Sequence, residues 1–353
     1  MILVTGGAGY IGSHCVKELL RHGHDVVVLD NLSRGFREAV LTEHFVQADL
    51  LDCEALKLVF EEYSIDSVIH FAGLTQVGES MTNPDLYYSN NLVGTLNLLR
   101  AMRDHNVAKI IFSSSAAVYG NPGIVPVSEG HDKRPTNTYG KTKWMAEQVM
   151  EDYSRAYGLR YIALRYFNVA GCDPEGQLGE NNNPETHLVP IVLDVALGKS
   201  EHIAIFGTDY NTEDGTCVRD YIHVCDLVEA HILAMESLVR GADSTAYNLG
   251  TGSGHSVREI IDVCQKISRA SIPVIEGPRS PGDPSRLVAN PALSLEKLGW
   301  RPKQSGLETI VKTALSWRRN KMWQKQDKGL QDCFDVIRAE KNKERDECGY
   351  THN

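Results

Sequence analysis

Three glycines near the start of the chain constrain its fold most strongly. Gly6, Gly9 and Gly12 follow an apolar run at residues 1–4, and apolar residues at helical spacing begin at Ile11. This order predicts a buried strand, a tight turn and a helix. Because glycine has no Cβ atom, such a turn can approach a pyrophosphate closely, and the free N–H groups of the helix N-terminus face its charge. The turn therefore predicts a dinucleotide site, whereas a glycine-rich connection that binds nothing would need neither the strand nor the helix.

An acidic residue ends the second apolar run. Residues 26–29 are apolar and lead to Asp30, about twenty residues beyond the turn. A carboxylate at this place accepts hydrogen bonds from both ribose hydroxyls, which favours NAD over NADP. Arg34 and Arg37 lie nearby and leave an alternative, because a guanidinium there would favour a 2′-phosphate.

Apolar runs alternate with helical patterns over the first half of the chain. This alternation predicts an α/β fold with a Rossmann-type, doubly wound parallel sheet that helices cover on both faces. Ligands of such sheets bind beyond the carboxyl ends of the strands. The expected strands are 1–5, 25–30, 44–48, 67–72, 109–113 and 160–165, and the expected helices are about 11–22, 53–62, 91–105 and 139–157.

After residue 167 the elements become shorter and less regular, which predicts a smaller C-terminal α/β lobe for substrate, with the active site between the lobes. We expect a loop at 171–187, helices near 188–198 and 256–269, strands near 202–206 and 272–275, and a short apolar run near 247–249. The predicted domains are 1–167 for NAD, 168–322 for substrate, with part of it packing back on the first domain, and a charged, partly helical tail at 323–353.

The composition excludes several classes of protein. A net charge of −10, with 42% hydrophobic and 23% charged residues, is typical of a soluble globular protein and argues against nucleic-acid binding. No apolar run is long enough to span a membrane, and the first strand begins too early to leave room for a signal peptide. The eight cysteines are scattered without a C-x-x-C pair. We therefore expect reduced thiols, no metal site and a cytoplasmic location.

A tyrosine and a lysine four residues apart carry the chemical signal. Tyr139 and Lys143 lie in a helical pattern, so their side chains leave one face, one turn apart. A free tyrosine titrates at about pH 10, but a nearby ammonium and the positive nicotinamide of an oxidised cofactor lower that pKa. Tyr139 can then take a proton from a hydroxyl while hydride leaves the same carbon. Ser115, expected at the end of the fifth strand, can orient that hydroxyl, and this favours an acid/base pair over an ordinary surface pair.

Several segments together resemble the UDP-glucose 4-epimerase family of the extended short-chain dehydrogenase/reductase superfamily. They are T-G-G-A-G-Y-I-G-S-H at 5–14, D-N-L-S at 30–33, H-F-A-G-L at 70–74, S-S-S-A-A-V-Y-G at 113–120, Y-G-K-T-K at 139–143, L-R-Y-F-N at 164–168, and T-E-D-G-T-C-V-R-D-Y-I-H-V at 212–224. The resemblance covers about residues 1–320, and the last segment is specific to the epimerase and its close relatives. It implies a two-lobed fold, tightly held NAD, and interconversion of UDP-glucose and UDP-galactose.

The resemblance implies a mechanism with three catalytic residues. Tyr139 takes the proton of the 4-hydroxyl, with Ser115 and Lys143 beside it, while C4 gives hydride to NAD. The 4-keto sugar then turns over, and hydride returns to the opposite face. Because the sugar must turn, the UDP part has to be the anchor.

The resemblance also assigns binding residues. Arg219 is expected to grip the diphosphate, because its fork matches phosphate oxygens, although an ion pair with Asp220 or Asp226 is an alternative. The other expected substrate residues are Ser115, Tyr139, Asn168, Leu188, Phe206, Asp283 and Leu287. The expected cofactor residues are Gly6, Gly9, Tyr10, Ile11, Gly12, Asp30, Asn31, Asp49, Leu50, Phe71, Ala72, Gly73, Asn91, Ser113, Tyr139, Lys143 and Tyr166.

The chain departs from the family pattern in places. Residues 75–76 are Thr-Gln where some members have a lysine, and residues 186–187 are Thr-His where some have an asparagine pair. Arg279 is followed by Ser280, so the second phosphate contact falls either to Arg279 or to Arg286. Leucine at 287 replaces a tyrosine that excludes N-acetylated sugars in some members, which predicts that UDP-GlcNAc and UDP-GalNAc also fit.

Three other functions compete with this interpretation. A sugar dehydratase would place Asp-Glu after Ser115, where this chain has Ala116 and Ala117. A UDP-glucuronate 4-epimerase or decarboxylase would need an extra cation for the substrate carboxylate, and none stands out. A non-catalytic NAD-sensing scaffold would be expected to lose the tyrosine or the lysine. The resemblance also implies a homodimer that packs the helices near 91–105 and 139–157 against a second copy.

Overall fold

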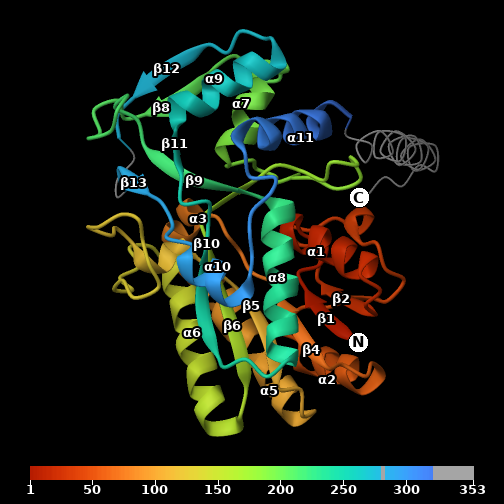
Figure 1. Cartoon of the computed structure of the whole chain (residues 1–353). Coiled ribbons are helices and arrows are strands. Elements are labelled where there is room, and N and C mark those ends of the chain that lie inside the picture. The colour runs from red at the N-terminus through yellow and green to blue at the C-terminus, as the bar shows by residue number, and fades with distance from the viewer. Residues whose placement is uncertain (280–282, 321–353) are drawn as a thin grey trace, which may run out of the picture.

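The chain forms a larger and a smaller lobe, which lie one above the other in Figure 1. The computed structural model describes residues 1–279 and 283–320, and the tail predicted for 323–353 lies outside them. Across the described ranges, no helix combines the length and the apolar character needed to cross a membrane.

The larger lobe is built on a parallel sheet in the order β10-β6-β5-β4-β1-β2-β3. The chain runs outward from β1 in one direction and then restarts at β4 on its other side, which confirms the predicted Rossmann-type, doubly wound fold. The strands are β1 (Ile2–Thr5), β2 (Val26–Asp30), β3 (Phe45–Gln47), β4 (Ser67–His70), β5 (Lys109–Ser115), β6 (Arg160–Tyr166) and β10 (Thr245–Leu249).

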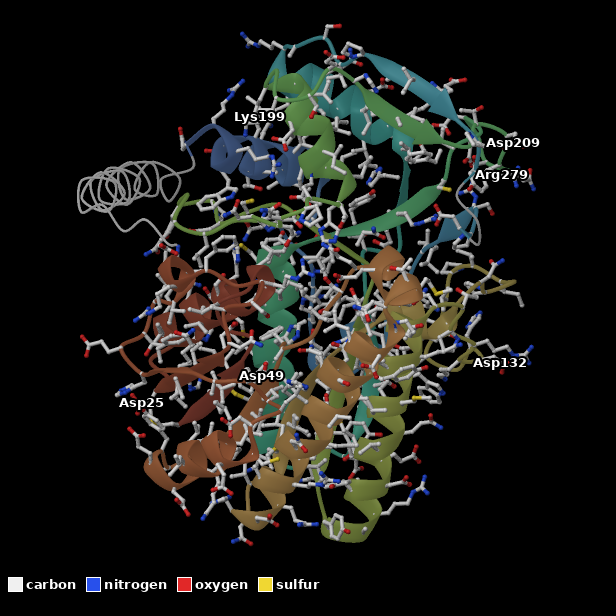
Figure 2. The ribbon with its side chains drawn as sticks, turned by 180° about the vertical axis from the view of Figure 1, so that it is seen from behind. Asp25, Asp49, Asp132, Lys199, Asp209 and Arg279 are labelled. Carbon is white, nitrogen blue, oxygen red and sulfur yellow. The ribbon has the colours of Figure 1, made fainter. Side chains whose placement is uncertain are left out.

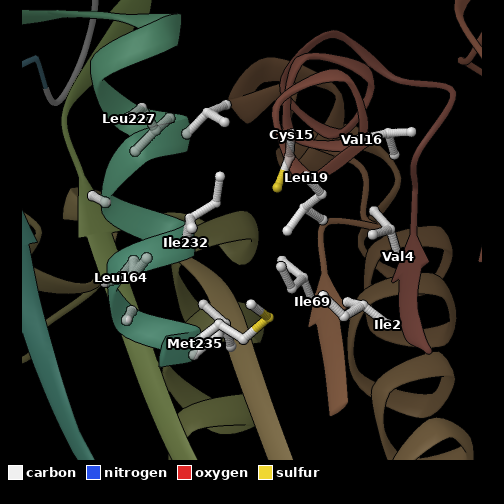
Figure 3. Packing of buried hydrophobic residues seen from close by; sticks show 14 of the residues in the cluster. Ile2, Val4, Cys15, Val16, Leu19, Ile69, Leu164, Leu227, Ile232 and Met235 are labelled. Atoms are coloured by element: carbon white, nitrogen blue, oxygen red, sulfur yellow. The ribbon is translucent and has the colours of Figure 1, made fainter. Parts of the chain in front are cut away.

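Helices bury both faces of this sheet, which is why its strands read as continuous apolar runs. In Figure 3, Leu227, Ile232 and Met235 of one helix face Cys15 and Leu19 of a neighbouring helix on the same face of the sheet. One face carries α1 (Tyr10–Arg21), α8 (Val224–Val239) and α10 (Ala292–Leu298); the other carries α2 (Cys53–Glu62), α5 (Gly94–Asp104) and α6 (Thr138–Tyr157). Short elements join them: η1 (Arg37–Ala39), α3 (Val77–Thr82), α4 (Pro84–Tyr87), the π-helical turn η2 (Tyr88–Val93) and η3 (Ala116–Tyr119).

Among the described residues, the smaller lobe contains two small sheets and three helices, and most of these elements contribute to one core. The first sheet has the order β11-β9-β13, with β7 also paired to β9, and the second pairs β8 with β12. The elements are β7 (Asn168–Ala170), α7 (Leu188–Ala196), β8 (Ile203–Phe206), β9 (Val218–His223), β11 (Gly254–Ser256), α9 (Val257–Ser268), β12 (Val274–Gly277), β13 (Arg286–Leu287) and α11 (Leu307–Asn320).

The chain passes between the lobes several times after residue 167. It enters the smaller lobe with β7, returns to the larger with α8 and β10, and returns again with α10 (Figure 1). The sequence pattern does not single out α8, because this helix is buried on most sides and its polar stripe, with Glu229 and Glu236, is narrow.

Candidate active site

The glycine turn lies at the carboxyl end of β1. Gly6 has a φ of +74°, and a Cβ atom on it would lie 2.5 Å from the backbone nitrogen of Ala72. A Cβ atom on Gly12 would lie 2.1 Å from the carbonyl oxygen of Gly6. Both positions therefore require glycine. Helix α1 follows Gly9 without a side-chain cap, so its first N–H groups are available to a phosphate.

Asp30 ends β2 beside this turn. Its Oδ2 accepts a hydrogen bond from the Ala8 N–H at 3.0 Å, and its Oδ1 accepts one from the Leu32 N–H at 2.8 Å. Burial raises the pKa of Asp30, and the two backbone donors oppose that shift. Each carboxylate oxygen has a further lone pair, so Asp30 retains acceptor capacity for ribose hydroxyls.

The two arginines near Asp30 have other partners. The guanidinium of Arg37 lies over the Phe45 ring, 4.6 Å from its centroid. The guanidinium of Arg34 donates from Nη2 to Oε1 of Glu79 on α3 at 2.8 Å. These contacts agree with a ribose diol at Asp30 rather than a 2′-phosphate.

Further predicted cofactor residues lie at the same sheet edge. Nδ2 of Asn31 donates to Oδ2 of Asp49 at 2.7 Å, next to the buried Leu50. The Tyr10 hydroxyl donates to the carbonyl of Gly171 at 2.5 Å, so this side chain ties the turn to the loop after β7. The neighbouring Ile11 packs against the core of the larger lobe.

Two hollows adjoin the turn. The larger has a volume of about 280 Å³ and lies between the loops after β2 and β4 and the loop before α7. The smaller is lined by the glycine turn, and Arg34, Phe36 and Asn182 line both. The glycine turn and the helix N-terminus at the smaller hollow, with Asp30 bonded to Ala8 of that turn, fit a dinucleotide.

Aromatic residues follow β4 and β6. The rings of Phe71 and Tyr166 lie 4.7 Å and 6.2 Å from the ring of His231 on α8, and the Tyr166 hydroxyl makes a short hydrogen bond to Ser113. Burial lowers the pKa of His231 to about 4, so its ring is neutral. Its Nδ1 lies 2.9 Å from the Leu227 carbonyl, whereas its Nε2 has no partner among the described residues.

Tyr139 lies in the first turn of α6 and packs against Tyr87. Burial raises the pKa of Tyr139, and a hydrogen bond from Ser115 opposes the shift without cancelling it. The sequence predicts a lowered pKa through Lys143. The structure gives the opposite sign, because desolvation dominates and the Lys143 ammonium lies 6.0 Å from the ring centroid.

Lys143 lies one turn further along α6. Its Nζ donates to the carbonyl of Ser113 at 2.8 Å and lies 4.9 Å from the centroid of the Phe112 ring. Burial lowers its pKa to about 8, and Glu147 opposes that shift. A Cβ atom on Gly73 would lie 3.3 Å from Nζ, so this glycine gives the lysine room.

Asn91 joins these residues from the π-helical turn η2. Its Oδ1 accepts from the Leu74 N–H at 2.8 Å, and its Nδ2 donates to the Leu74 carbonyl at 2.9 Å and to Thr142 at 3.2 Å. The structure thus brings Ser115, Tyr139 and Lys143 together at the sheet edge that also carries the glycine turn and Asp30.

A buried ion pair behind the catalytic residues is absent from the sequence prediction. Arg165 of β6 and Glu147 of α6 expose only 6% and 4% of their side chains. The available signal is the spacing of Tyr139, Lys143 and Glu147, which puts all three on one face of the helix.

Three of the expected substrate residues, Asn168, Arg219 and Leu287, lie on the first sheet of the smaller lobe. Arg219 of β9 pairs with Leu287 of β13 in register, and Asn168 of β7 pairs with Tyr221 of β9. Nη2 of Arg219 donates to Oδ1 of Asp283 at 2.5 Å, so Asp283 replaces both aspartates that the sequence offers as ion-pair partners.

Two other expected residues lie at the ends of elements. Leu188 begins α7, and Phe206 ends β8 with 56% of its side chain exposed. Arg279 lies against Gly207, the residue after Phe206, and its Nε donates to Asp209 at 2.6 Å (Figure 2). The alternative cation, Arg286, is paired with Glu213.

One group of potential metal ligands occurs in the described part of the chain. It comprises Glu180, Glu185 and His187, whose ligand atoms lie within 4.8 Å of one another. Glu180 raises the pKa of His187 to about 9. The His187 ring and the Glu180 carboxylate form an ion pair, so a metal here would have to displace the proton of the imidazole.

The sequence of the chain matches a known family. Residues 2–250 match the model of the NAD dependent epimerase/dehydratase family, which is more than two thirds of the chain. The chain belongs to this family. The part of the chain that matches the NAD dependent epimerase/dehydratase family includes the glycine turn and all three catalytic candidates. Asp283 and Leu287 lie beyond it.

Similar proteins cover almost the whole described chain. The UDP-glucose 4-epimerase of Halalkalibacterium halodurans is 51% identical over 318 residues, which are 90% of this chain and 95% of that protein. The crystal structure of UDP-glucose 4-epimerase from Brucella ovis in complex with NAD is 49% identical with a TM-score of 0.87, and covers 89% of this chain and 97% of its own. The crystal structure of UDP-glucose 4-epimerase from Bifidobacterium longum in complex with NAD+ and UDP is 39% identical with a TM-score of 0.85. The match covers 90% of this chain and 98% of that chain.

Proposed function

We propose that this protein is an NAD-dependent epimerase that interconverts UDP-galactose and UDP-glucose at C4 through a 4-keto intermediate. The observation that carries the proposal is the meeting of Tyr139, Ser115 and Lys143 at the sheet edge beside the glycine turn. The names of the relatives at 39–51% identity support the same reaction.

The chain's own residues would hold and move the proton. Ser115 orients the 4-hydroxyl, and Tyr139 accepts its proton and later returns it. Lys143 keeps a positive charge near the phenolate that forms. The glycine turn and Asp30 would hold NAD, which would supply reversible hydride transfer at C4 of the sugar.

The diphosphate anchor would be Arg219. Its guanidinium is held by Asp283, which fixes its direction and still leaves donors for phosphate oxygens. Arg279 and Arg286 lie on the same side of the smaller lobe, each paired with a surface carboxylate, and either can turn to the second phosphate.

NMR of UDP-galactose incubated with the purified protein and NAD tests the proposal. We expect conversion to UDP-glucose, and loss of conversion in Tyr139→Phe with NAD still bound. If the wild-type protein binds NAD but converts nothing, the epimerase proposal fails, and a uronate epimerase or a scaffold becomes the better interpretation.

A second activity, on UDP-GlcNAc and UDP-GalNAc, is favoured by Leu287. This side chain is partly buried against a cluster that includes Ala116 and Phe167, next to Ser115. Tyrosine is larger than leucine, so it would reduce the room for an acetamido group. We expect Leu287→Tyr to lower kcat/KM for UDP-GalNAc at least about tenfold relative to UDP-galactose, an effect of about 1.4 kcal/mol. An unchanged ratio of the two activities would contradict this prediction.

We also propose a homodimer that works in the cytoplasm. Val93 and Met145, at the start of α5 and on α6, are exposed apolar residues on the helices expected at the contact. The six described cysteines are free, which suits a reducing compartment. Light scattering should give twice the chain mass of 39.1 kDa; the mass of one chain would contradict the dimer.

A further inference from the structure

Helix α6 contacts the three successive serines at 113–115 of β5 through three polar side chains. They belong to Tyr139, Lys143 and Glu147, which follow one another at intervals of four residues. Tyr139 and Lys143 contact the outer two serines, as described above. Glu147 contacts the middle one, accepting a hydrogen bond from the Ser114 hydroxyl at 2.5 Å. Glu147 is therefore the third contact by which α6 docks on the strand that carries the catalytic serine.

Arg165 fixes the Glu147 carboxylate from the neighbouring strand. Its Nη2 lies 2.5 Å from Oε2, and its Nε lies 3.0 Å from Oε1, which is a forked pair. Nη1 of Arg165 also donates to the Tyr119 hydroxyl at 2.9 Å, which donates to Asn248 of β10 at 2.7 Å. A buried ion without its partner is costly, so the two side chains form a fixed unit.

Glu147 also acts on the charge of Lys143, opposing the larger effect of burial. The titratable groups that act on or respond to Lys143 are Tyr139 and Glu147 on its own helix and His70 at the end of β4; Arg165 lies behind Glu147. Burial lowers the pKa of His70 to about 3, and Tyr139 is neutral in the resting site, so neither opposes the ammonium with a negative charge. Within the described residues, Glu147 is the negative charge that acts on Lys143.

We propose that Glu147 is a positioning residue for the reaction. Clamped by Arg165, it keeps Lys143 charged and docked on β5, and so it sets the upper pH limit of activity. The inference rests on the proposed function, because it explains how that function's acid/base pair is maintained.

Glu147→Gln is the test, because glutamine keeps the shape and can still accept from Ser114, but it carries no charge and leaves Arg165 unpaired. We expect the alkaline limb of the kcat–pH profile to move down by about one pH unit, while KM changes little. The matched control is Glu151→Gln, one turn further along α6, where an exposed carboxylate pairs with Arg155. This control should leave the profile unchanged.

A second variant keeps the inference testable if Glu147→Gln folds poorly. Glu147→Gln with Arg165→Met removes both charges, and we expect its alkaline limb to lie between those of the wild type and the single variant. A uniform loss of kcat at every pH in both variants, with the limb unmoved, would overturn the inference and leave Glu147 a purely structural residue.

A measurement without turnover separates this inference from the proposed function. The difference in free energy of unfolding between each background and its Lys143→Met variant reports the protonation of Lys143. That difference should begin to change at a lower pH in the Glu147→Gln background. If the wild type and Glu151→Gln convert no UDP-galactose, the proposed function fails, and this second readout still decides whether Glu147 keeps Lys143 charged.

Discussion

Lys143 combines a position in the interior with a charge. Its ammonium is held by one carbonyl and one aromatic face, and burial lowers its pKa to about 8. Burying it costs stability, which the fold tolerates because the group is needed beside Tyr139. The catalytic need for a buried ammonium at Lys143 therefore lowers the free energy of unfolding of the folded chain.

Lys143→Met should reveal this cost as a pH dependence. The pKa of Lys143 is 10.5 ordinarily and about 8 in the folded chain, so between these values the unfolded state binds more protons. The free energy of unfolding of the wild type should therefore rise with pH in this window relative to Lys143→Met, by up to about 3 kcal/mol. Below pH 8 the difference should be constant. Urea unfolding at steps across the window measures it, and a flat difference would contradict the prediction.

Among elements, α6 carries most of the chemistry. Its N-cap residue, Asn137, accepts from the Gly140 N–H at 2.8 Å, and Tyr139 lies within the turn that this bond closes. The cap therefore holds the catalytic tyrosine as well as the helix end.

Asn137→Ala should cost about 1 kcal/mol of stability and also lower kcat, because the first turn of α6 then frays. The control is Asp52→Ala, which removes the cap of α2, where Oδ1 accepts from the Ala55 N–H at 3.0 Å. Both variants should lose similar stability in urea, and only Asn137→Ala should lose activity. Equal kcat values in the two variants would show that the cap does not position Tyr139.

Across the whole molecule, three segments meet over the cofactor hollow. Arg34 bonds Glu79 at 2.8 Å and reaches the Asn183 carbonyl at 3.5 Å, and Gln76 donates to the Pro184 carbonyl at 3.4 Å. The loops after β2 and β4 are thereby tied to the loop before α7. These contacts, which we call the clasp, link residues of both lobes that line or adjoin the hollow.

Arg34→Ala should release NAD faster, because the clasp loses its central cation. We expect an increase in the dissociation rate of about tenfold, equivalent to about 1.4 kcal/mol, measured by exchange of bound NAD in stopped flow. Arg37→Ala is the matched control, since Arg37 is on the same loop and packs on Phe45 away from the hollow. Equal release rates in the two variants would rule out the clasp.

Local signals made the NAD side predictable from sequence. The glycine turn and Asp30 each lie within a few residues of a strand end, and strand and helix periods fix their places. The Arg219–Asp283 pair joins residues 64 positions apart, and no spacing rule connects them. The resemblance to a family points to Arg219 and Asp283 as substrate residues. Only the structure shows that the two side chains contact each other.

Other features were hidden because burial removes the pattern. Helix α8 is buried on most sides, and β10 leaves the smaller lobe to become the edge of the large sheet. The role of Glu147 could have been read from its four-residue spacing after Lys143, but a carboxylate in a helix is ordinarily a solvated one.

Because the chain passes repeatedly between the lobes, the protein cannot be shortened to one lobe by a single cut without removing parts of that lobe. A fragment that ends at residue 167 contains the glycine turn and the catalytic tyrosine, yet it lacks β10 and α8. The hydrogen-bonding edge of β6 would be bare, and the apolar residues that α8 covers, such as Leu164 and Ile69, would face water. Such a fragment should aggregate rather than bind a nucleotide, so the smallest autonomous unit of this protein contains both lobes.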